Sequence, residues 1–368
     1  MKPGRPDRME AYIALNSLTS IVVNNFYALM EAFGSADDVF GANMHALRAV
    51  DGVGPETARQ IKECDPRKTA DKERKAAGKN GVKIVAEFEE DFPKNLKTLH
   101  KPPPVIYIAG EITGEDRLAI SIVGARKFSV YGRIIAEDFS ATLAARGLTV
   151  VSGMARGIDT IAHKGALKAG ARTIAVLGSG LDVCYPPENR ELFDKIKNQG
   201  AVVSQFPFGT GPEKRNFPIR NRVICGLGFG VLVIEAGEKS GANITAYAAL
   251  DEGREVFAVP GRIDSPKSAG THRLIQRGAK LVTCADDVID EFPPEVRALL
   301  ERQESGREVE LSNDEKKVMA LLDSSERHVD YLIEKSGMPS GVVLGILLEL
   351  ELKGVVRQLP GKVFARAG

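Results

Sequence analysis

The feature that most constrains the fold is an alternation of short apolar runs with helix-length segments between residues 118 and 283. The runs are rich in valine, isoleucine and alanine and carry few charges, which is typical of strands buried on both faces. We interpret as strands the runs 119–123, 148–152, 172–177, 201–204, 230–234, 255–259 and 280–283. Strands that alternate with helices build a parallel sheet, so the sequence predicts an α/β domain with a Rossmann-like, doubly wound, mostly parallel sheet.

The turns at the two ends of these strands differ in composition. Most helix-to-strand turns carry little beyond a glycine that suits a helix C-cap, at Gly147, Gly170, Gly200, Gly253 and Gly278. The strand-to-helix turns are rich in glycine, serine and arginine, and they all lie at the carboxyl edge of the sheet, where such folds bind ligands. Glycines let backbone amides approach an anion, and helix N-termini and guanidinium groups attract it. The candidate phosphate-binding residues in these turns are Gly124, Arg126, Ser129, Ser152, Gly153, Arg156, Gly157, Ser240 and Gly241.

A basic run, residues 214–222, follows the fourth predicted strand and contains four cations and a phenylalanine without any acid. Pro218 suits the first turn of a helix, so nearby arginines would sit where the helix dipole disfavours positive charge and a negative group should offset them. Clustered cations beside a ring that can stack on bases are what binding of a single-stranded nucleic acid requires. The candidate residues are Lys214, Phe217, Arg220, Asn221 and Arg222. The alternative interpretation is a solvated surface turn.

Several classes of site and protein are disfavoured. The net charge is only +1, so affinity for a nucleic acid must come from clustered charge. The four cysteines form no CxxC pair and the five histidines no HExxH motif, which argues against a disulfide framework and a metal site. Gly178-Ser179-Gly180 lacks the third glycine of a dinucleotide fingerprint, so no cofactor is expected. The N-terminus lacks the apolar core of a signal peptide and no apolar run is long enough to span a bilayer, so we expect a cytoplasmic protein without membrane contact.

At 368 residues, the chain is expected to form two or three domains. We predict a helical domain at 1–75, the Rossmann-like domain at 80–293, a linker at 294–310 and a winged helix at 311–368. In the helical domain, the Gly52-Val53-Gly54 turn between two amphipathic segments is typical of a helix-hairpin-helix (SAM-like) module, which either holds a phosphate or only packs.

The predicted winged helix begins with a capping box formed by Ser312 and Glu315 and includes a third helix at 340–353. This third helix has no cation before Lys353, whereas a helix that reads the major groove normally carries Arg, Lys, Asn or Gln. We therefore favour a protein-contact or structural role for this domain.

The central segment resembles DNA-processing protein A, the DprA/Smf family of natural transformation. The matching stretches are 121–126, 152–163, 178–189, 217–222, 233–236, 240–246 and 256–261. The flanking domains follow the usual order of this family more loosely. Gln205, Gly228, Asn243 and His272 depart from its usual residues, but none of these departures removes a cation.

The resemblance implies a non-enzymatic, single-stranded DNA-binding protein that protects incoming DNA and helps to load the recombinase RecA. It further implies a homodimer built on the central domain. The DNA pocket of the family carries over onto Arg126, Lys214, Phe217, Arg220 and Arg222, and Arg156 stands where the family usually has a basic residue.

One enzymatic alternative remains open on the residues alone. Rossmann-like nucleotide phosphoribohydrolases use a carboxylate to cleave an N-glycosidic bond, a role that Glu235 would take here. Their Pro-Gly-Gly-x-Gly-Thr signature is absent, however. Asp159 and His163, four residues apart, form either an acid–base pair or a capping carboxylate beside a packed imidazole. We expect no catalytic residue.

Overall fold

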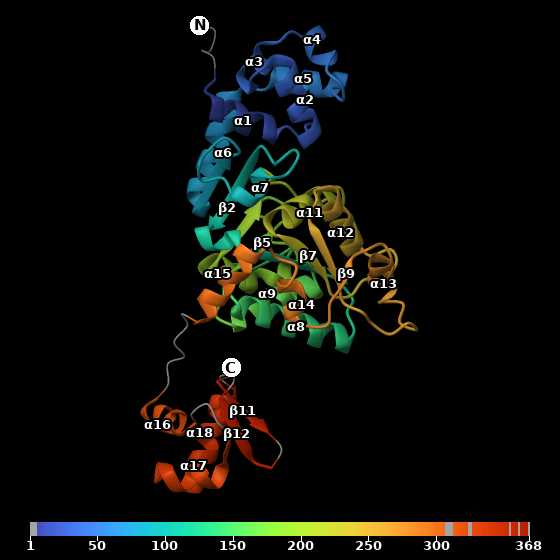
Figure 1. The fold of residues 1–368 in the computed structure, drawn as a ribbon. Helices are drawn as coiled ribbons and strands as arrows, with labels where there is room; N and C mark the ends of the chain where they lie inside the picture. The colour runs from blue at the N-terminus through green and yellow to red at the C-terminus, as the bar shows by residue number, and fades with distance from the viewer. Residues whose placement is uncertain (1–5, 306–311, 323–325, 353–354, 360, 367–368) are drawn as a thin grey trace. The chain divides into compact units, whose positions relative to one another are not determined.

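The computed structural model describes residues 6–305, 312–322, 326–352, 355–359 and 361–366. The chain divides into two compact units, residues 1–302 and 303–368, each with its own hydrophobic core (Figure 1). The first unit contains an N-terminal group of helices and a nine-stranded sheet.

The N-terminal group consists of six helices that run to residue 80. They are α1 (Arg8–Ser17), α2 (Val23–Phe33), α3 (Ala36–Gly41), α4 (Met44–Arg48), α5 (Pro55–Glu63) and α6 (Pro66–Asn80). Asp7 and Glu10 form a capping box at the start of α1. The turn between α4 and α5 needs Gly52, whose φ of +76° lies in the left-handed region. A helical hairpin therefore forms where the sequence predicts one.

The sheet has the order β1-β2-β6-β5-β4-β3-β7-β8-β9. Its strands are β1 (Val82–Ala86), β2 (Val105–Gly110), β3 (Ala119–Val123), β4 (Thr149–Ser152), β5 (Thr173–Val176), β6 (Ala201–Ser204), β7 (Gly230–Val233), β8 (Glu255–Ala258) and β9 (Lys280–Leu281). Strands β3 to β9 are parallel, which confirms the predicted doubly wound sheet. Two antiparallel strands, β1 and β2, extend it beyond β6 and were not predicted.

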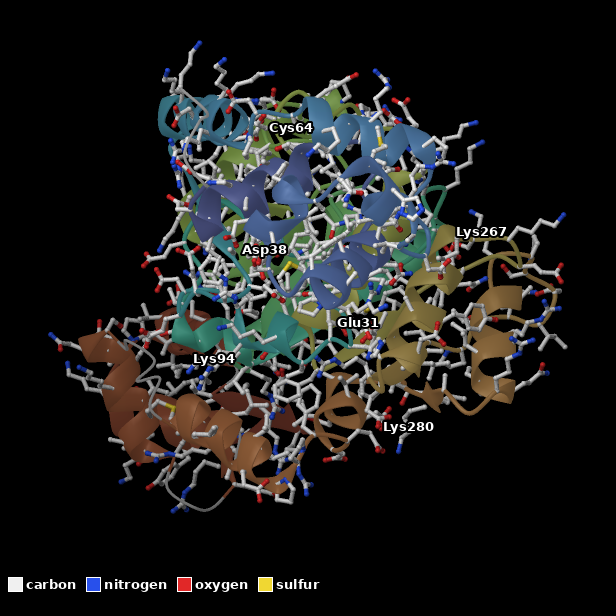
Figure 2. All side chains as sticks on the ribbon, turned by 90° about the horizontal axis from the view of Figure 1, so that it is seen from above. Glu31, Asp38, Cys64, Lys94, Lys267 and Lys280 are labelled. Carbon is white, nitrogen blue, oxygen red and sulfur yellow. The ribbon has the colours of Figure 1, made fainter. Side chains whose placement is uncertain are left out.

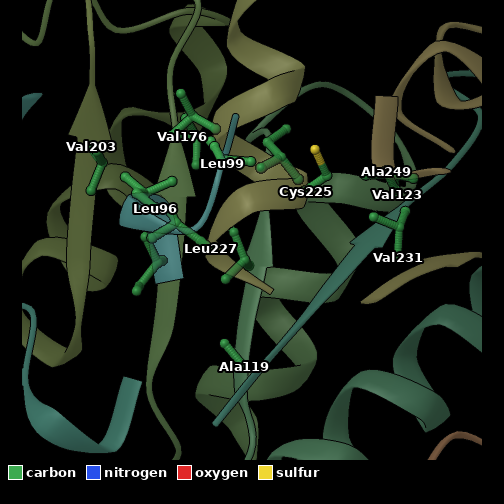
Figure 3. Close-up of a cluster of buried hydrophobic side chains, with 14 of the residues drawn as sticks. Leu96, Leu99, Ala119, Val123, Val176, Val203, Cys225, Leu227, Val231 and Ala249 are labelled. Atoms are coloured by element: carbon green, nitrogen blue, oxygen red, sulfur yellow. The ribbon is translucent and has the colours of Figure 1, made fainter. Parts of the chain in front are cut away.

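Helices cover both faces of the sheet because successive strand residues point to opposite sides (Figure 1). One face packs under α7 (Lys94–Lys97), α11 (Asn216–Leu227), α12 (Gly241–Asp251) and α13 (Ala269–Gln276). The other packs under α8 (Val130–Ala145), α9 (Ile158–Lys168), α10 (Arg190–Gln199), α14 (Ala285–Ile289) and α15 (Pro294–Ser305), with α1 alongside. Figure 3 shows the first face, where Val176 and Val203 of the sheet lie near Leu96, Leu99 and Leu227. Burial of each such leucine stabilises the fold by about 1.5–3 kcal/mol.

The predicted glycine caps take two forms. Gly147, Gly170, Gly253 and Gly278 have positive φ values, as left-handed caps require. Gly200 is different, because its φ is −165°. A Cβ on Gly200 would lie 2.1 Å from the carbonyl oxygen of Thr173. Glycine is thus needed at this position for a close approach of two backbones and not for a left-handed turn.

The predicted linker at 294–310 begins with a helix, which corrects the sequence interpretation for that part. Helix α15 starts directly at Pro294, and its Leu300 is buried in the core beneath α8 and α9. Residues 306–310 lie outside the described residues. No helix in the described part of the chain is long and apolar enough to cross a membrane.

The second unit is a winged helix. It contains α16 (Asn313–Leu321), β10 (Arg327–His328), α17 (Val329–Ser336), α18 (Ser340–Leu352), β11 (Val356–Leu359) and β12 (Val363–Arg366), with the strand order β10-β12-β11. The predicted capping box of Ser312 and Glu315 opens α16. Helix α18 exposes Leu344 and Leu348. Its role in protein contacts stays a prediction.

Candidate nucleic-acid interface

A small pocket opens at the carboxyl edge of the sheet, above β3, β4 and β5 and beside the first turn of α11. It is lined by Arg126, Gly153, Ala155, Arg156, Gly178, Ser179, Tyr185, Pro186, Pro212, Phe217 and Arg220. These residues come from the loops after β3, β4, β5 and β6, which the strand order places next to one another, and from the start of α11. The pocket volume of about 20 Å³ accommodates a single water-sized group. We call it the rim pocket.

Phe217 lies at the centre of the rim pocket between two guanidinium groups. The Cζ atom of Arg126 is 5.4 Å from the centroid of its ring, and that of Arg220 is 5.8 Å away. The ring of Tyr185 follows at 6.0 Å, inclined by 48°. Gly178 allows this arrangement, because a Cβ there would lie 3.0 Å from Cδ1 of Phe217. Two neighbouring aromatic rings therefore each lie against at least one guanidinium group, a favourable electrostatic arrangement.

Arg220 is only 4% exposed, although it lines the pocket. Its Nη1 donates to the carbonyl oxygen of Gly153 at 2.6 Å and to that of Val176, and its Nε donates to Oδ1 of Asn221 at 3.2 Å. Burial lowers the pKa of Arg220 to about 10, so the group stays charged at neutral pH. Arg220 thus supplies a positive charge and also ties α11 to the ends of β4 and β5.

Asp159, in the first turn of α9, supplies the negative charge that the basic run requires. Its carboxylate is 7% exposed, and burial raises the pKa of Asp159 to about 6 while the charge of Arg220 opposes this shift. Gly153 packs closely against both side chains. A Cβ on Gly153 would lie 2.7 Å from Oδ2 of Asp159 and 2.8 Å from Cζ of Arg220. Each buried charge therefore offsets part of the desolvation of the other.

Arg126 and Arg156 stand exposed at the mouth of the rim pocket. The Nη2 of Arg156 is 3.0 Å from Oε2 of Glu188, and its guanidinium lies over the ring of Tyr185. In the described part of the chain, Arg126 has no acidic partner. The charge of Arg156 is thus already paired, whereas no ion pair involves the exposed Arg126 among the described residues.

The loop between β4 and α9 is held in a tight conformation. Ser152 is buried and donates its hydroxyl to the carbonyl oxygen of Ile122 at 2.6 Å. Met154 adopts a φ of +54°, which is uncommon for a residue with a side chain. Gly157 is required, since a Cβ would lie 2.3 Å from the carbonyl oxygen of Ala125. Of these predicted site residues, Ser152 and Gly157 shape the loop without lining the pocket. Gly124 does likewise, because its Cβ position abuts Ile158.

Three predicted residues of the basic run lie outside the rim pocket. Lys214 is exposed on the loop that leads into α11. Asn221 is buried and accepts the hydrogen bond from Arg220. Arg222 forms an ion pair with Glu252, the residue that follows α12. The structure therefore brings Phe217 and Arg220 together with Arg126 and Arg156, and it places Arg222 elsewhere.

The candidates near β7 serve a different purpose. The strand order reverses between β3 and β7, the position at which doubly wound sheets usually bind ligands. Here the 4% exposed carboxylate of Glu235 fills that position and accepts a hydrogen bond from the amide of Ser129 at 2.8 Å. The Ser129 hydroxyl caps α8 and the Ser240 hydroxyl caps α12, directly before Gly241. None of these residues lines the rim pocket.

Asp159 and His163 do not form an acid–base pair. Nδ1 of His163 lies 2.7 Å from the hydroxyl oxygen of Thr173, and burial lowers the pKa of His163 to about 3. The imidazole is fully buried and neutral, which is the structural alternative left open by the sequence. No cluster of three or more potential metal ligands occurs within the described ranges.

Sequence reasoning missed part of the pocket. Tyr185, Gly178 and Ser179 line it and were not among the predicted site residues, although Gly178 and Ser179 lie in a glycine-rich strand-to-helix turn and Tyr185 in a Tyr-Pro dipeptide. An aromatic residue directly before a proline in such a loop is the signal that points to Tyr185.

The sequence was compared with known protein families and proteins. Residues 83–293 match the family described as DNA recombination-mediator protein A, and residues 302–362 match the DprA winged helix domain. Protein Smf of Escherichia coli is 39% identical over 285 residues, which cover 76% of this chain and 76% of that protein. DNA processing protein DprA of Bacillus subtilis is 40% identical over 214 residues, 58% of this chain and 72% of the relative.

Two solved structures are similar to the fold. The X-ray structure of DNA processing protein A from Streptococcus pneumoniae has a TM-score of 0.67 at 34% identity and covers 78% of this chain and 99% of that one. DNA processing protein A from Helicobacter pylori, whose structure describes a single-stranded DNA binding mode, has a TM-score of 0.52 at 28% identity. It covers 60% of this chain and 96% of its own.

Proposed function

Because this chain belongs to the DNA recombination-mediator protein A family, we propose that it binds single-stranded DNA, protects incoming DNA and assists RecA loading during natural transformation. One observation carries the proposal: three arginines and two aromatic rings from three loops and helix α11 meet at the rim pocket. The single-stranded DNA binding of the Helicobacter pylori relative supports it. The protein acts in the cytoplasm, where incoming DNA and RecA meet.

The geometry assigns different tasks to the residues of the pocket. A phosphate oxygen fits the space of about 20 Å³, where Arg126, Arg156 and Arg220 attract it. A base reaches the face of Phe217 when the exposed Arg126 side chain turns aside. Neither contact reads the edge of a base, so binding tolerates any sequence.

The test is a fluorescence anisotropy titration of the full-length protein with labelled single-stranded and double-stranded oligonucleotides at stepped salt concentrations. We expect tighter binding of the single strand and a linear fall of log K with log salt. Equal affinity for the duplex, or an affinity that salt leaves unchanged, would contradict the proposal.

We further propose a homodimer built on the central domain. Ile244 and Leu250 of α12 and Leu281 of the edge strand β9 are exposed apolar side chains, whereas charged side chains such as Lys267 and Lys280 project at the periphery of the same part of the chain (Figure 2). Replacing Leu250 with Glu should shift the sedimentation coefficient towards that of a monomer.

The RecA proposal is tested by measuring RecA filament formation on single-stranded DNA coated with this protein. We expect the protein to accelerate filament formation.

The enzymatic alternative is a phosphoribohydrolase that uses Glu235. The hydrogen bond from Ser129 and the burial of the carboxylate favour a structural role for Glu235. Incubation of the protein with nucleoside monophosphates should release no free base. Turnover that Glu235→Gln abolishes would favour the enzyme instead.

A further inference from the structure

A second cavity of the first unit is separate from the rim pocket. It has a volume of about 510 Å³ and lies between the N-terminal helices and the segment that joins β6 to α11. Helices α1, α2 and α6 contribute Asn16, Phe26 and Glu73. A cavity of this volume is the size of a nucleotide-binding site. We call it the interdomain cavity.

The interdomain cavity and the rim pocket share one wall. In the first turns of α11, Asn216 and Ile219 face the cavity, whereas Phe217 and Arg220 face the pocket. The loop before the helix is divided in the same way. Its Arg215 lines the cavity, its Pro212 lines the pocket, and Lys214 is exposed between them. A strand held in the pocket therefore needs only to cross this loop to reach the cavity.

The walls of the cavity suit a flat, uncharged heterocycle. The half-buried Phe206 and Phe208 provide aromatic surface, and Asn16 and Gln205 provide neutral polar groups. Such rings stack on bases irrespective of the sequence.

Charge is distributed so that a phosphate stays outside the interdomain cavity. The Glu73 carboxylate in the wall is 4% exposed and accepts a hydrogen bond from the amide of Phe208 at 3.1 Å. A buried carboxylate repels a phosphate, but it accepts hydrogen bonds from the amino group of a base. The cation Lys72 is exposed at the edge of the cavity, where Arg215 is paired with Glu213 at 2.7 Å.

We infer that the interdomain cavity binds a nucleobase, supplied either by the strand held in the rim pocket or by a free nucleotide. In the first case the backbone crosses Lys214, which gives this exposed lysine a phosphate to contact. If the strand is the source of the base, the inference rests on the proposed function. The experiment distinguishes the strand from a free nucleotide.

The protein has no tryptophan, so a single introduced indole reports on the cavity without background. Val22 is 45% exposed and lines the cavity, and the exposed Thr19 lines it too. Val22→Trp and Thr19→Trp place the probe at the opening. Met44→Trp is the matched control, because Met44 is an exposed apolar residue of the same helical group outside the cavity. Each variant is titrated with oligothymidylate, oligodeoxyadenylate, dTMP and dAMP, while anisotropy of a labelled oligonucleotide records strand binding.

We expect oligonucleotides to quench the indole of Val22→Trp and Thr19→Trp with a midpoint equal to the dissociation constant from anisotropy, and to leave Met44→Trp unchanged. Saturable quenching by dTMP or dAMP alone would identify a free nucleotide as the source. Normal strand binding with no quenching by any probe, or equal quenching of the control, would overturn the inference and leave the proposed function intact. Failure of the unmodified protein to bind the labelled oligonucleotide would instead refute the proposed function.

Discussion

At the scale of single residues, the basic run divides its tasks in a way that its composition does not indicate. Phe217 is a half-buried ring between Arg126 and Arg220. Arg220 is buried and donates hydrogen bonds to the carbonyl oxygens of Gly153 and Val176, whereas Arg126 is exposed at the pocket mouth. A substitution of Arg220 therefore disturbs the fold as well as the charge, so Arg126 is the cleaner test of electrostatic attraction.

Phe217 tests the stacking contribution. Phe217→Leu retains apolar bulk against Gly178 but removes the ring, and it should weaken binding of single-stranded DNA by about 1–3 kcal/mol. Phe217→Tyr keeps the ring and should bind with nearly unchanged affinity. Anisotropy titrations at one salt concentration compare the two variants. Equal affinities of the Leu and Tyr variants would place the stacking surface elsewhere.

Arg126 tests the phosphate contact. Arg126→Ala should reduce the magnitude of the slope of log K against log salt by about 0.7, the amount expected for one phosphate contact on a single strand. Arg262→Ala is the control, because Arg262 is exposed on another loop of the same sheet edge and already pairs with Asp264. The slope of the control should match that of the unmodified protein. A slope for Arg126→Ala that equals the control would exclude Arg126 from the binding site.

Asp159 and His163 make opposite contributions to the pH dependence of stability. The folded-state pKa of Asp159, about 6, lies above its unfolded value of about 3.9, so its stabilisation is lost as the pH rises through 6. The folded-state pKa of His163, about 3, lies below its unfolded value of about 6.5, so its stabilisation is lost as the pH falls towards 3. Between pH 4 and 6 the two contributions oppose each other.

Substitution of either residue should therefore reveal the pH dependence of stability that the other residue contributes. From pH 4 to pH 6, the unfolding free energy of Asp159→Asn should rise relative to the unmodified protein by up to about 1.4 kcal/mol per pH unit, and that of His163→Gln should fall by a similar amount. Urea unfolding at pH 4, 5 and 6 measures both. Three parallel pH curves would show that neither group is protonated as described.

At the scale of elements, the helix N-termini at the sheet edge are used in two ways. The start of α11 carries the residues of the rim pocket, whereas the start of α8 is satisfied by the protein's own Glu235. Packing around Glu235 is close, because a Cβ on Gly132 would lie 2.5 Å from its Oε2. A glycine-rich turn before a helix is thus not sufficient to identify an anion site, since an internal carboxylate can already occupy it.

Glu235 should therefore matter for stability more than for binding. Glu235→Ala leaves the amide of Ser129 without its buried acceptor, which should lower the unfolding free energy by about 1–3 kcal/mol. At urea concentrations at which the variant remains folded, its affinity for single-stranded DNA should equal that of the unmodified protein. Urea unfolding and anisotropy provide the two measurements. A stable variant that loses DNA binding would reverse the assignment.

The sequence predicted the parallel strands well because each is an apolar run bounded by glycine or charge, and burial on both faces demands that pattern. It could not place Arg222 or Ser240 relative to the pocket, because the direction of a side chain depends on which helix packs beside it. Arg222 pairs with Glu252, which follows α12 and lies 30 residues away in the sequence. Strands β1 and β2 were missed, since an antiparallel pair separated by a proline-rich segment lacks the alternation with helices.

At the scale of the whole molecule, the two units have separate cores. Val318, Leu332, Val343 and Phe364 pack within the winged helix, and Leu300 of α15 belongs to the core of the first unit. Every residue of the rim pocket and of the interdomain cavity comes from the first unit. The affinity for single-stranded DNA is thus expected to depend on the first unit alone.

Removal of residues 306–368 tests this division, because it retains α15 and its buried Leu300. The shortened protein should keep its thermal stability and bind single-stranded DNA within about 0.5 kcal/mol of the full chain, as expected for independent units. A much larger loss of affinity would assign part of the DNA contact to the winged helix.

The carboxylate at the start of α8 also determines where a bound strand can go. On the β7 side of the rim pocket, the guanidinium groups of Arg262 and Arg273 are already neutralised by Asp264 and Glu238, and Glu235 fills the crevice between them and the pocket. On the β6 side, Lys214 stands exposed beside a cavity large enough for a base. For a strand bound as proposed, the β6 side therefore offers an exposed lysine beside a cavity, whereas Arg262 and Arg273 on the β7 side are already paired with acids.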